Sequence, residues 1–299
     1  MSTNENKGKK AEVTALQAIS AEDRKDWISL AFVQAGICVC VPAFLLGALL
    51  AEAMPIWPAI ISGSLGYLIV VVGMVATGMI GCDLGLASCT CCQAGFGKSG
   101  ARFIVSTIFA VNMIGWFGIQ NGVCGEAFSN AMLAMTGWDI PVVVSNTIWG
   151  IIMLLTAVYG VHALEKLDKI SIPLLMIIMC YGIFLAFKVY GTGNLNDEGT
   201  VQSMSFMSGV ALSFNFTAVG TITGPDYTRF QKSRKDTVKS VFYGVFPMGV
   251  ITLIMGIVLT KLSGQYDISM VLIEVGLPLL GIIAVSYTHL RAHETSAHL

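Results

Sequence analysis

Long apolar runs separated by short polar segments make up the chain from Trp27 onward. A helix needs about 20 mainly apolar residues to cross a bilayer. By this measure the pattern predicts eight spans, at 28–51, 57–80, 102–123, 141–161, 170–190, 204–224, 240–261 and 268–285. The weaker apolar run 127–136 is expected to form the outer end of the third span, followed by a loop. The pattern therefore predicts an all-α integral membrane protein, with a transmembrane domain over 27–285 and no room for a soluble domain between spans.

Basic residues are distributed unevenly between the two sides of these spans. If the N-terminus is cytoplasmic, fourteen Lys and Arg residues fall in inside segments, and only Lys188 and Lys261 fall outside. Cytoplasmic loops carry such an excess, so the distribution predicts a multi-pass protein of the cell membrane with its N-terminus inside. Residues 1–26 are polar and charged and are expected to form a cytoplasmic tail.

The composition changes this picture little. Hydrophobic residues make up 55% of the chain and charged residues 12%, and the few basic residues are dispersed over short loops, which gives no indication of nucleic-acid binding. Four of the eight cysteines lie in apolar runs, where a thiol packs as a small hydrophobe. Cys82, Cys89, Cys91 and Cys92 cluster, but no second ligand pair or histidine follows at zinc spacing, so packing is favoured over a metal site.

The last fourteen residues, 286–299, are unlike the rest. They hold three of the four histidines and interrupt the eighth apolar run. A histidine-rich metal tract is one interpretation. A fusion scar or a misassembled reading frame is favoured, so this tail is treated as non-native and the natural chain is expected to continue.

Two spans carry residues that interrupt helices. Pro42 lies in the middle of the first span, where it removes a backbone donor and frees a carbonyl one turn earlier. The sixth span, around 213–226, is rich in Gly and Thr and includes Asn215, and Thr217, Thr221 and Thr223 could add oxygen ligands. Ordinary kinks are the alternative. Because spans one and six hold corresponding places in two five-span halves, the pattern favours an inverted-repeat transporter with a binding site at mid-membrane.

The third span carries the candidate ligand face. Asn112, Trp116 and Gln120 recur every four residues and are expected to share one side of the helix, with Gly115 and Gly118 allowing close approach. An indole plane beside amides suits a flat polar ligand. The alternative is a helix–helix seam held together by amides and small residues.

Four segments carry a family resemblance: Gly115–Gln120, Ala94–Gly100, Gly224–Phe230 and Phe32–Gly36. They resemble the nucleobase:cation symporter family of cytosine, purine, hydantoin and allantoin permeases, with Phe32–Gly36 similar to its cytosine permease branch. The resemblance implies a leucine-transporter-type fold of twelve spans, ten of them in two inverted repeats. About eight would be present here, so the chain is expected to be truncated at its C-terminal end.

The resemblance also implies roles for individual residues. The family's stacking tryptophan matches Trp116, and a substrate amide one turn later matches Gln120. A substrate-contacting position of the first span matches Cys40. The second aromatic, on span six, matches Thr217, with Phe216 and Phe214 nearby.

The remaining positions concern the cation and a second amide. Backbone carbonyls that hold Na+ in the family match Gly36 and Val39. In the cytosine branch a substrate amide lies one turn before the tryptophan. That position is occupied here by Met113, with Asn112 next to it. A further substrate amide and cation-binding hydroxyls belong to span eight, beyond Val285.

These inferences predict a secondary transporter that imports cytosine or a related planar heterocycle together with Na+ or H+, with one copy of the chain as the transport unit in membrane lipid. The alternatives are a channel-like or sensory membrane protein of the same fold, or a carrier of a different heterocycle such as a hydantoin, allantoin or vitamin-like pyrimidine. No nucleophile–base arrangement, phosphate loop or metal motif supports an enzyme, and no cofactor besides a coupling ion is expected.

Overall fold

The computed structural model describes residues 17–159, 161–192, 195, 203–265, 268–275, 277 and 279, with the side chains of 156–172 left out. This part of the chain is helical, with one isolated β-bridge between Lys25 and Gln231. The first half comprises η1 (Ala21–Asp23), α1 (Trp27–Cys38), α2 (Val41–Ala53), α3 (Ile56–Leu84), α4 (Ser88–Cys91), α5 (Gln93–Gly100), η2 (Ala101–Val105) and α6 (Ser106–Thr136). The second half comprises α7 (Val142–Tyr159), α8 (Val161–Tyr190), α9 (Phe206–Thr217), α10 (Val219–Thr228), α11 (Arg234–Ser263) and α12 (Ile268–Glu274).

The helices follow the predicted spans. Within the described residues, five helices are long and apolar enough to cross a membrane, or six when α1 and α2 count as one bent span. The helix α7 adds a shorter apolar segment, Val142–Leu155. The predicted extension 127–136 continues the third span as the C-terminal end of α6. Of the eighth predicted span only α12 and a few further residues are described, and the tail 286–299 lies outside the described residues.

The first span is broken where the sequence predicts it. Helices α1 and α2 meet at an angle of 53°. Val39 leaves the helical region (φ −92°, ψ 77°) and Cys40 is extended. Pro42 then lies in the first turn of α2, where its missing N–H would have no helical partner and its fixed φ favours the helix. The proline therefore begins a new helix after the break.

The sixth span is interrupted less than the sequence suggests. Only Ala218 separates α9 from α10, and together they count as one helix of 23 residues, Phe206–Thr228. Pro225 cannot donate to the carbonyl of Thr221 four residues earlier. The hydroxyl of Thr77 on α3 donates to that carbonyl at 2.6 Å. A side chain from another helix thus replaces the missing hydrogen bond and keeps α10 helical.

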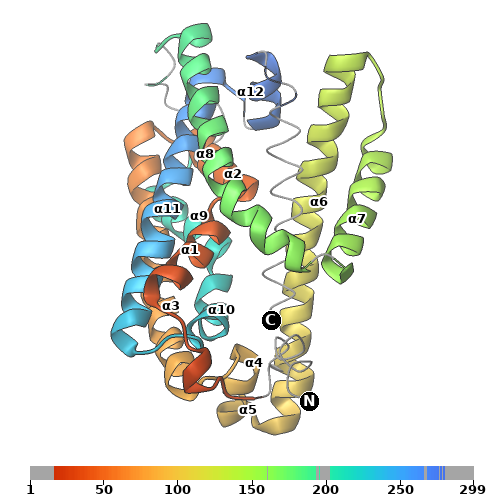
Figure 1. Ribbon diagram of the computed structural model, residues 1–299. Helices are drawn as coiled ribbons and strands as arrows, with labels where there is room; N and C mark the ends of the chain where they lie inside the picture. The colour runs from red at the N-terminus through yellow and green to blue at the C-terminus, as the bar shows by residue number, and fades with distance from the viewer. Residues whose placement is uncertain are drawn as a thin grey trace.

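The first and sixth spans and the helices that follow them pack reciprocally. Helix α3, which follows the first span, packs along α9 and α10, whereas α11, which follows the sixth span, packs along α1 and α2. Figure 1 shows these helices gathered in one bundle, with α6 and α7 standing apart from it and α8 crossing between. Such an exchange of partners between two halves is what an inverted repeat produces.

Small residues set the closest approaches in this bundle. A Cβ added to Gly256 of α11 would lie 2.2 Å from the carbonyl oxygen of Phe44 on α2. On α6 the close approach is at Gly125, where a Cβ would meet the side chain of Asn146 on α7. Among the described residues, nothing lies within 4 Å of a Cβ added to Gly115 or Gly118. Close approach at these two glycines stays a prediction.

The end of the predicted N-terminal tail packs on the bundle. Ile19 is 5% exposed, and its amide donates to the carbonyl of Gly85 at 2.9 Å. The Arg24 guanidinium donates to the carbonyl of Gln231, and the Lys25 amide donates to that of Phe230. Residues 17–26 thereby connect the end of α3 to the segment between α10 and α11.

Candidate functional site

A cavity of about 560 Å³ lies at the break of the first span, between the α1–α3–α9–α11 bundle and α6. Its size is in the range of small-molecule pockets. It is lined by Gln34, Gly36, Ile37, Cys38, Cys40, Ala43, Tyr67, Val70, Met74, Met113, Ile114, Trp116, Phe117, Gln120, Met153, Leu154, Phe216, Thr217, Val219, Gly220, Thr223, Tyr227 and Val245. None of these is Asp, Glu, Lys, Arg or His, so the described wall of the cavity offers hydrogen bonds and aromatic faces but no formal charge.

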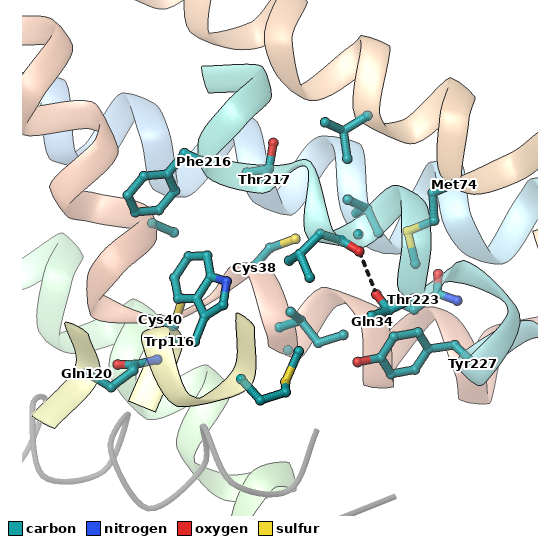
Figure 2. Close-up of a pocket in the computed structure, with 18 of the residues that line it drawn as sticks. Gln34, Cys38, Cys40, Met74, Trp116, Gln120, Phe216, Thr217, Thr223 and Tyr227 are labelled. Carbon is teal, nitrogen blue, oxygen red and sulfur yellow. Dashed lines mark hydrogen bonds between the residues drawn. The ribbon is translucent and has the colours of Figure 1, made fainter. Parts of the chain in front are cut away.

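At one end of the cavity two aromatic rings meet. The indole of Trp116 and the ring of Phe216 are perpendicular, with their centroids 5.4 Å apart. Figure 2 shows this pair with Gln120 and Cys40 beside it, and we call these four residues the aromatic end. Phe216, rather than the neighbouring Thr217, supplies the second ring on α9. A flat ligand could stack against the indole, with the Phe216 ring bounding the space.

Gln120 lies one turn after Trp116 and is 8% exposed. Asn112, in contrast, is exposed and outside the cavity lining. Successive helical residues turn by about 100°, and the face that lines the cavity is centred on Met113, Trp116, Phe117 and Gln120. Asn112 lies about a quarter turn from the centre of that face, so its predicted place in the site is corrected: Met113 faces the cavity instead.

The first span contributes Gly36 and Cys40 to the lining, on either side of its break. Val39 is 1% exposed and does not line the cavity. Its non-helical ψ turns its carbonyl away from the axis of α1, and the Gly36 carbonyl accepts a bond from the Val39 amide at 3.2 Å. A carbonyl has two lone pairs, so this hydrogen bond leaves Gly36 able to contact a cation.

The threonines of the sixth span use their hydroxyls locally. Thr217 donates to the carbonyl of Ser213 at 2.8 Å, Thr221 to that of Ala218, and Thr223 to that of Val219 at 3.1 Å. Such back-bonding is usual for threonine in membrane helices. Their hydroxyl oxygens keep only accepting capacity toward a ligand. Asn215 is exposed and outside the lining.

Gln34 is the residue that the sequence reasoning missed. It is 0% exposed and lines the cavity, and neither polar atom of its amide has a hydrogen-bond partner among the described residues. Figure 2 places it with Thr223 and Tyr227 at the end of the cavity away from Trp116, and we call these three residues the Gln34 end. A polar amide in the middle of an apolar span is energetically unfavourable in a membrane. Its presence in the sequence was the signal that could have identified Gln34 as a site residue.

The carboxylates near the bundle's α4 end belong to links between helices. Asp226 is 6% exposed and accepts hydrogen bonds from the Ser88 amide at 2.9 Å and the Ser88 hydroxyl at 2.5 Å. Asp83 forms a two-pronged ion pair with Arg234 at the protein surface, with distances of 2.6 to 3.0 Å. These bonds fix the start of α4 to α10 and the end of α3 to the start of α11.

The cysteine cluster next to this link has no metal-binding arrangement among the described residues. Burial, and next the nearby charge of Asp226, raise the pKa of the Cys91 thiol to about 11, so this thiol is protonated at neutral pH.

Comparison with known proteins agrees with this architecture. The family model for permeases for cytosine/purines, uracil, thiamine and allantoin matches residues 19–279. The cytosine permease of Escherichia coli (strain K12) is 27% identical over 266 residues, which cover 88% of this chain and 61% of that protein. The purine-uracil permease NCS1 of Arabidopsis thaliana is 25% identical over 247 residues, covering 74% and 41%. The chain thus spans about 61% of the length of the bacterial relative.

Solved structures share the fold. The inward-facing conformation of Mhp1 superposes with a TM-score of 0.80 at 18% identity, over 94% of this chain and 64% of that one. Mhp1 in a closed conformation with bromovinylhydantoin bound gives a TM-score of 0.78 at 17% identity, over 95% and 66%. Mhp1 is a nucleobase-cation-symport-1 family transporter. The predicted leucine-transporter-type fold, with part of its helices present, is confirmed.

These relatives are membrane transporters rather than enzymes, and the family model covers most of the chain. The predicted resemblance to the nucleobase:cation symporters is therefore confirmed: the chain belongs to the family of permeases for cytosine and purines, uracil, thiamine and allantoin.

Proposed function

We propose that this chain forms the substrate-binding core of a secondary active transporter that imports cytosine or a related planar heterocycle. The observation that carries the proposal is the aromatic end of the cavity, where Trp116, Phe216 and Gln120 lie at the break of the first span. Stacking on the indole would orient a flat ring, and the amide of Gln120 would form hydrogen bonds with the polar atoms at the edge of that ring. The absence of charge in the described lining suits a neutral nucleobase.

Symport with Na+ or H+ through alternating access is part of the same proposal. The backbone leaves the helical pattern at Val39, three residues after Gly36, and carbonyls at such breaks coordinate cations in inverted-repeat transporters. The excess of basic residues in the assigned inside segments supports a cytoplasmic N-terminus and a cell-membrane location.

Binding and transport can be tested separately. The purified chain in lipid nanodiscs should bind radiolabelled cytosine saturably, with competition by uracil, hypoxanthine or hydantoin identifying the preferred ring. Binding should be lost or strongly weakened in Trp116→Ala and kept in Asn112→Leu, which alters the exposed side of the same helix. No saturable binding of any of these compounds would overturn the proposal.

A carrier must also exchange its ligand across the membrane. Proteoliposomes loaded with unlabelled cytosine should accumulate labelled cytosine from outside. Binding without this exchange would favour the sensory alternative, whereas passage that does not saturate would favour a channel.

A further inference from the structure

We propose that the Gln34 end of the cavity is a second polar subsite, so that the ligand is a planar heterocycle carrying an uncharged hydrogen-bonding substituent. The inference rests on the proposed function, because the ring itself is assigned to the aromatic end. Gln34 would bind the substituent, with its amide donating and accepting.

The first support is the state of the Gln34 amide. Its Nε2 and Oε1 are buried without partners in the described structure, although the residue is 0% exposed. A buried amide without hydrogen bonds destabilises the folded protein, and most buried polar side chains are paired. Gln34 is among the residues that line the cavity. At 0% exposure its amide is reached once the adjoining side chains move, and a ligand bound at this end then supplies the missing partners.

The second support is the tight packing of α11 against the stem of the Gln34 side chain. Gly244 of α11 packs so tightly on α1 that a Cβ there would lie 2.7 Å from the Ala31 carbonyl oxygen and 3.1 Å from Gln34 Cβ. The stem of Gln34 is therefore held between α1 and α11. Figure 2 shows its amide beside Thr223 and Tyr227, at the opposite end of the cavity from the Trp116 ring.

The third support is the distance between the two ends. Phe216 and Thr223 are seven positions apart on α9–α10, which corresponds to about 10 Å of helix rise. Apolar side chains, including Ile37, Val70 and Val219, line the cavity together with these ends. The cavity is therefore polar at the aromatic end, apolar in the middle and polar at the Gln34 end. A compound with a polar ring edge at one end and a polar substituent at the other matches this arrangement.

The absence of formal charge restricts the substituent further. No charged side chain is among the described residues that line the cavity, and moving an ionised group out of water without a partner is strongly unfavourable. A hydroxyalkyl or carboxamide group therefore fits, and a carboxylate does not.

The test uses two matched ligand pairs and two matched variants of the full chain in nanodiscs. Each pair is a pyrimidine with a chain of five heavy atoms on ring carbon C5, ending in a methyl group or in a hydroxyl: 5-pentyluracil with 5-(4-hydroxybutyl)uracil, and 5-pentylcytosine with 5-(4-hydroxybutyl)cytosine. Such a chain reaches from a ring at the aromatic end toward the Gln34 end, about 10 Å away. The wild-type protein should bind the hydroxyl member of its preferred pair about two- to tenfold more tightly than the methyl member, as one added hydrogen bond allows. The analogue whose chain ends in a carboxylate should bind at least about tenfold more weakly than the hydroxyl compound.

Gln34→Leu should abolish this preference while leaving the affinity for the methyl compound nearly unchanged. It should also raise the unfolding temperature of the ligand-free protein, because it removes a buried unpaired amide. Gln231→Leu is the matched control: Gln231 is 0% exposed too, but it lies outside the cavity and donates to the Ser240 hydroxyl at 2.7 Å. This control should lower the unfolding temperature and keep the ligand preference.

The outcomes separate the two proposals. An unchanged preference for the hydroxyl compound in Gln34→Leu, or a fall in its unfolding temperature like that of Gln231→Leu, would show a structural role for Gln34 and overturn the subsite. If both methyl compounds bind in a Trp116-dependent way, that result leaves the proposed function standing. If no compound of either pair binds the wild-type protein, the proposed function fails and the subsite fails with it.

Discussion

Trp116 of α6 and Phe216 of α9 meet edge to face, with their ring centroids 5.4 Å apart and their planes at 90°. The two helices belong to different parts of the fold: α9 packs along α3 in the bundle, and α6 packs against α7. The contact therefore joins two groups of helices across the cavity. Any ligand that stacks on the indole would change this contact, which makes the pair a direct probe of the site.

Trp116→Ala is expected to weaken binding of a planar ligand by about 1–3 kcal/mol, because a stacking surface is lost. Phe216→Ala should weaken it as well. If both rings touch the same ligand, the double variant should deviate from additivity by at least about 0.5 kcal/mol. Equilibrium binding of radiolabelled cytosine, or of whichever ring competes best, measures all three variants.

Phe214→Ala is the matched control for Phe216→Ala, because Phe214 lies two residues earlier on α9 and outside the cavity lining. Its ligand affinity should equal that of the wild type. Equal losses in the two phenylalanine variants would instead mean that α9 was disturbed as a whole.

Thr77→Val is expected to destabilise the fold by about 1–3 kcal/mol, because it leaves the Thr221 carbonyl unpaired in front of Pro225. Valine keeps the shape of threonine but cannot donate. Unfolding in mixed micelles during an SDS titration provides the measurement. Thr147→Val, which removes an exposed hydroxyl bonded only to its own helix on α7, should stay within about 0.5 kcal/mol of the wild type. The same loss in both variants would contradict a special role for Thr77.

Gly256→Ala should destabilise the protein by about 1–3 kcal/mol, because its Cβ would lie 2.2 Å from the Phe44 carbonyl oxygen and force α11 away from α2. At Gly118 no described atom lies within 4 Å of an added Cβ, so Gly118→Ala should be neutral or stabilise α6 by up to about 1 kcal/mol. The same SDS titration compares them. A tolerated Gly256→Ala would mean that the two helices pack less closely than described.

Uptake of the preferred ring is expected to depend on one cation. Replacing Na+ by choline should abolish uptake if Na+ is bound at the carbonyls of Gly36 and Val39, whereas a protonophore should abolish it if H+ is coupled. Radiolabelled uptake into proteoliposomes with a defined ion gradient distinguishes the two. Uptake that responds to neither treatment would contradict symport.

The sequence alone determined the class of the protein, the positions of most spans and the break in the first one. These features depend on local chemistry: apolar runs long enough for a bilayer, and a proline that begins a new helix within such a run. Trp116 and Gln120 were also predicted as site residues, and the structure places both at the cavity. Both the four-residue spacing and the family resemblance pointed to these two residues, and the spacing also included Asn112, which lies outside the cavity lining.

The tertiary structure decided what depends on partners distant in the sequence. Pro225 does not open the sixth span because Thr77, on another helix, replaces its missing hydrogen bond. The second aromatic ring is Phe216 rather than Thr217, because the rotation of α9 against α6 decides which side chain meets the indole. In the sequence, Gln34 is one amide among apolar residues. Only the folded structure shows that α11 packs against its stem and that the residue lines the cavity. Burial and hydrogen-bond pairing arise between helices, so the order of residues along one helix cannot determine them.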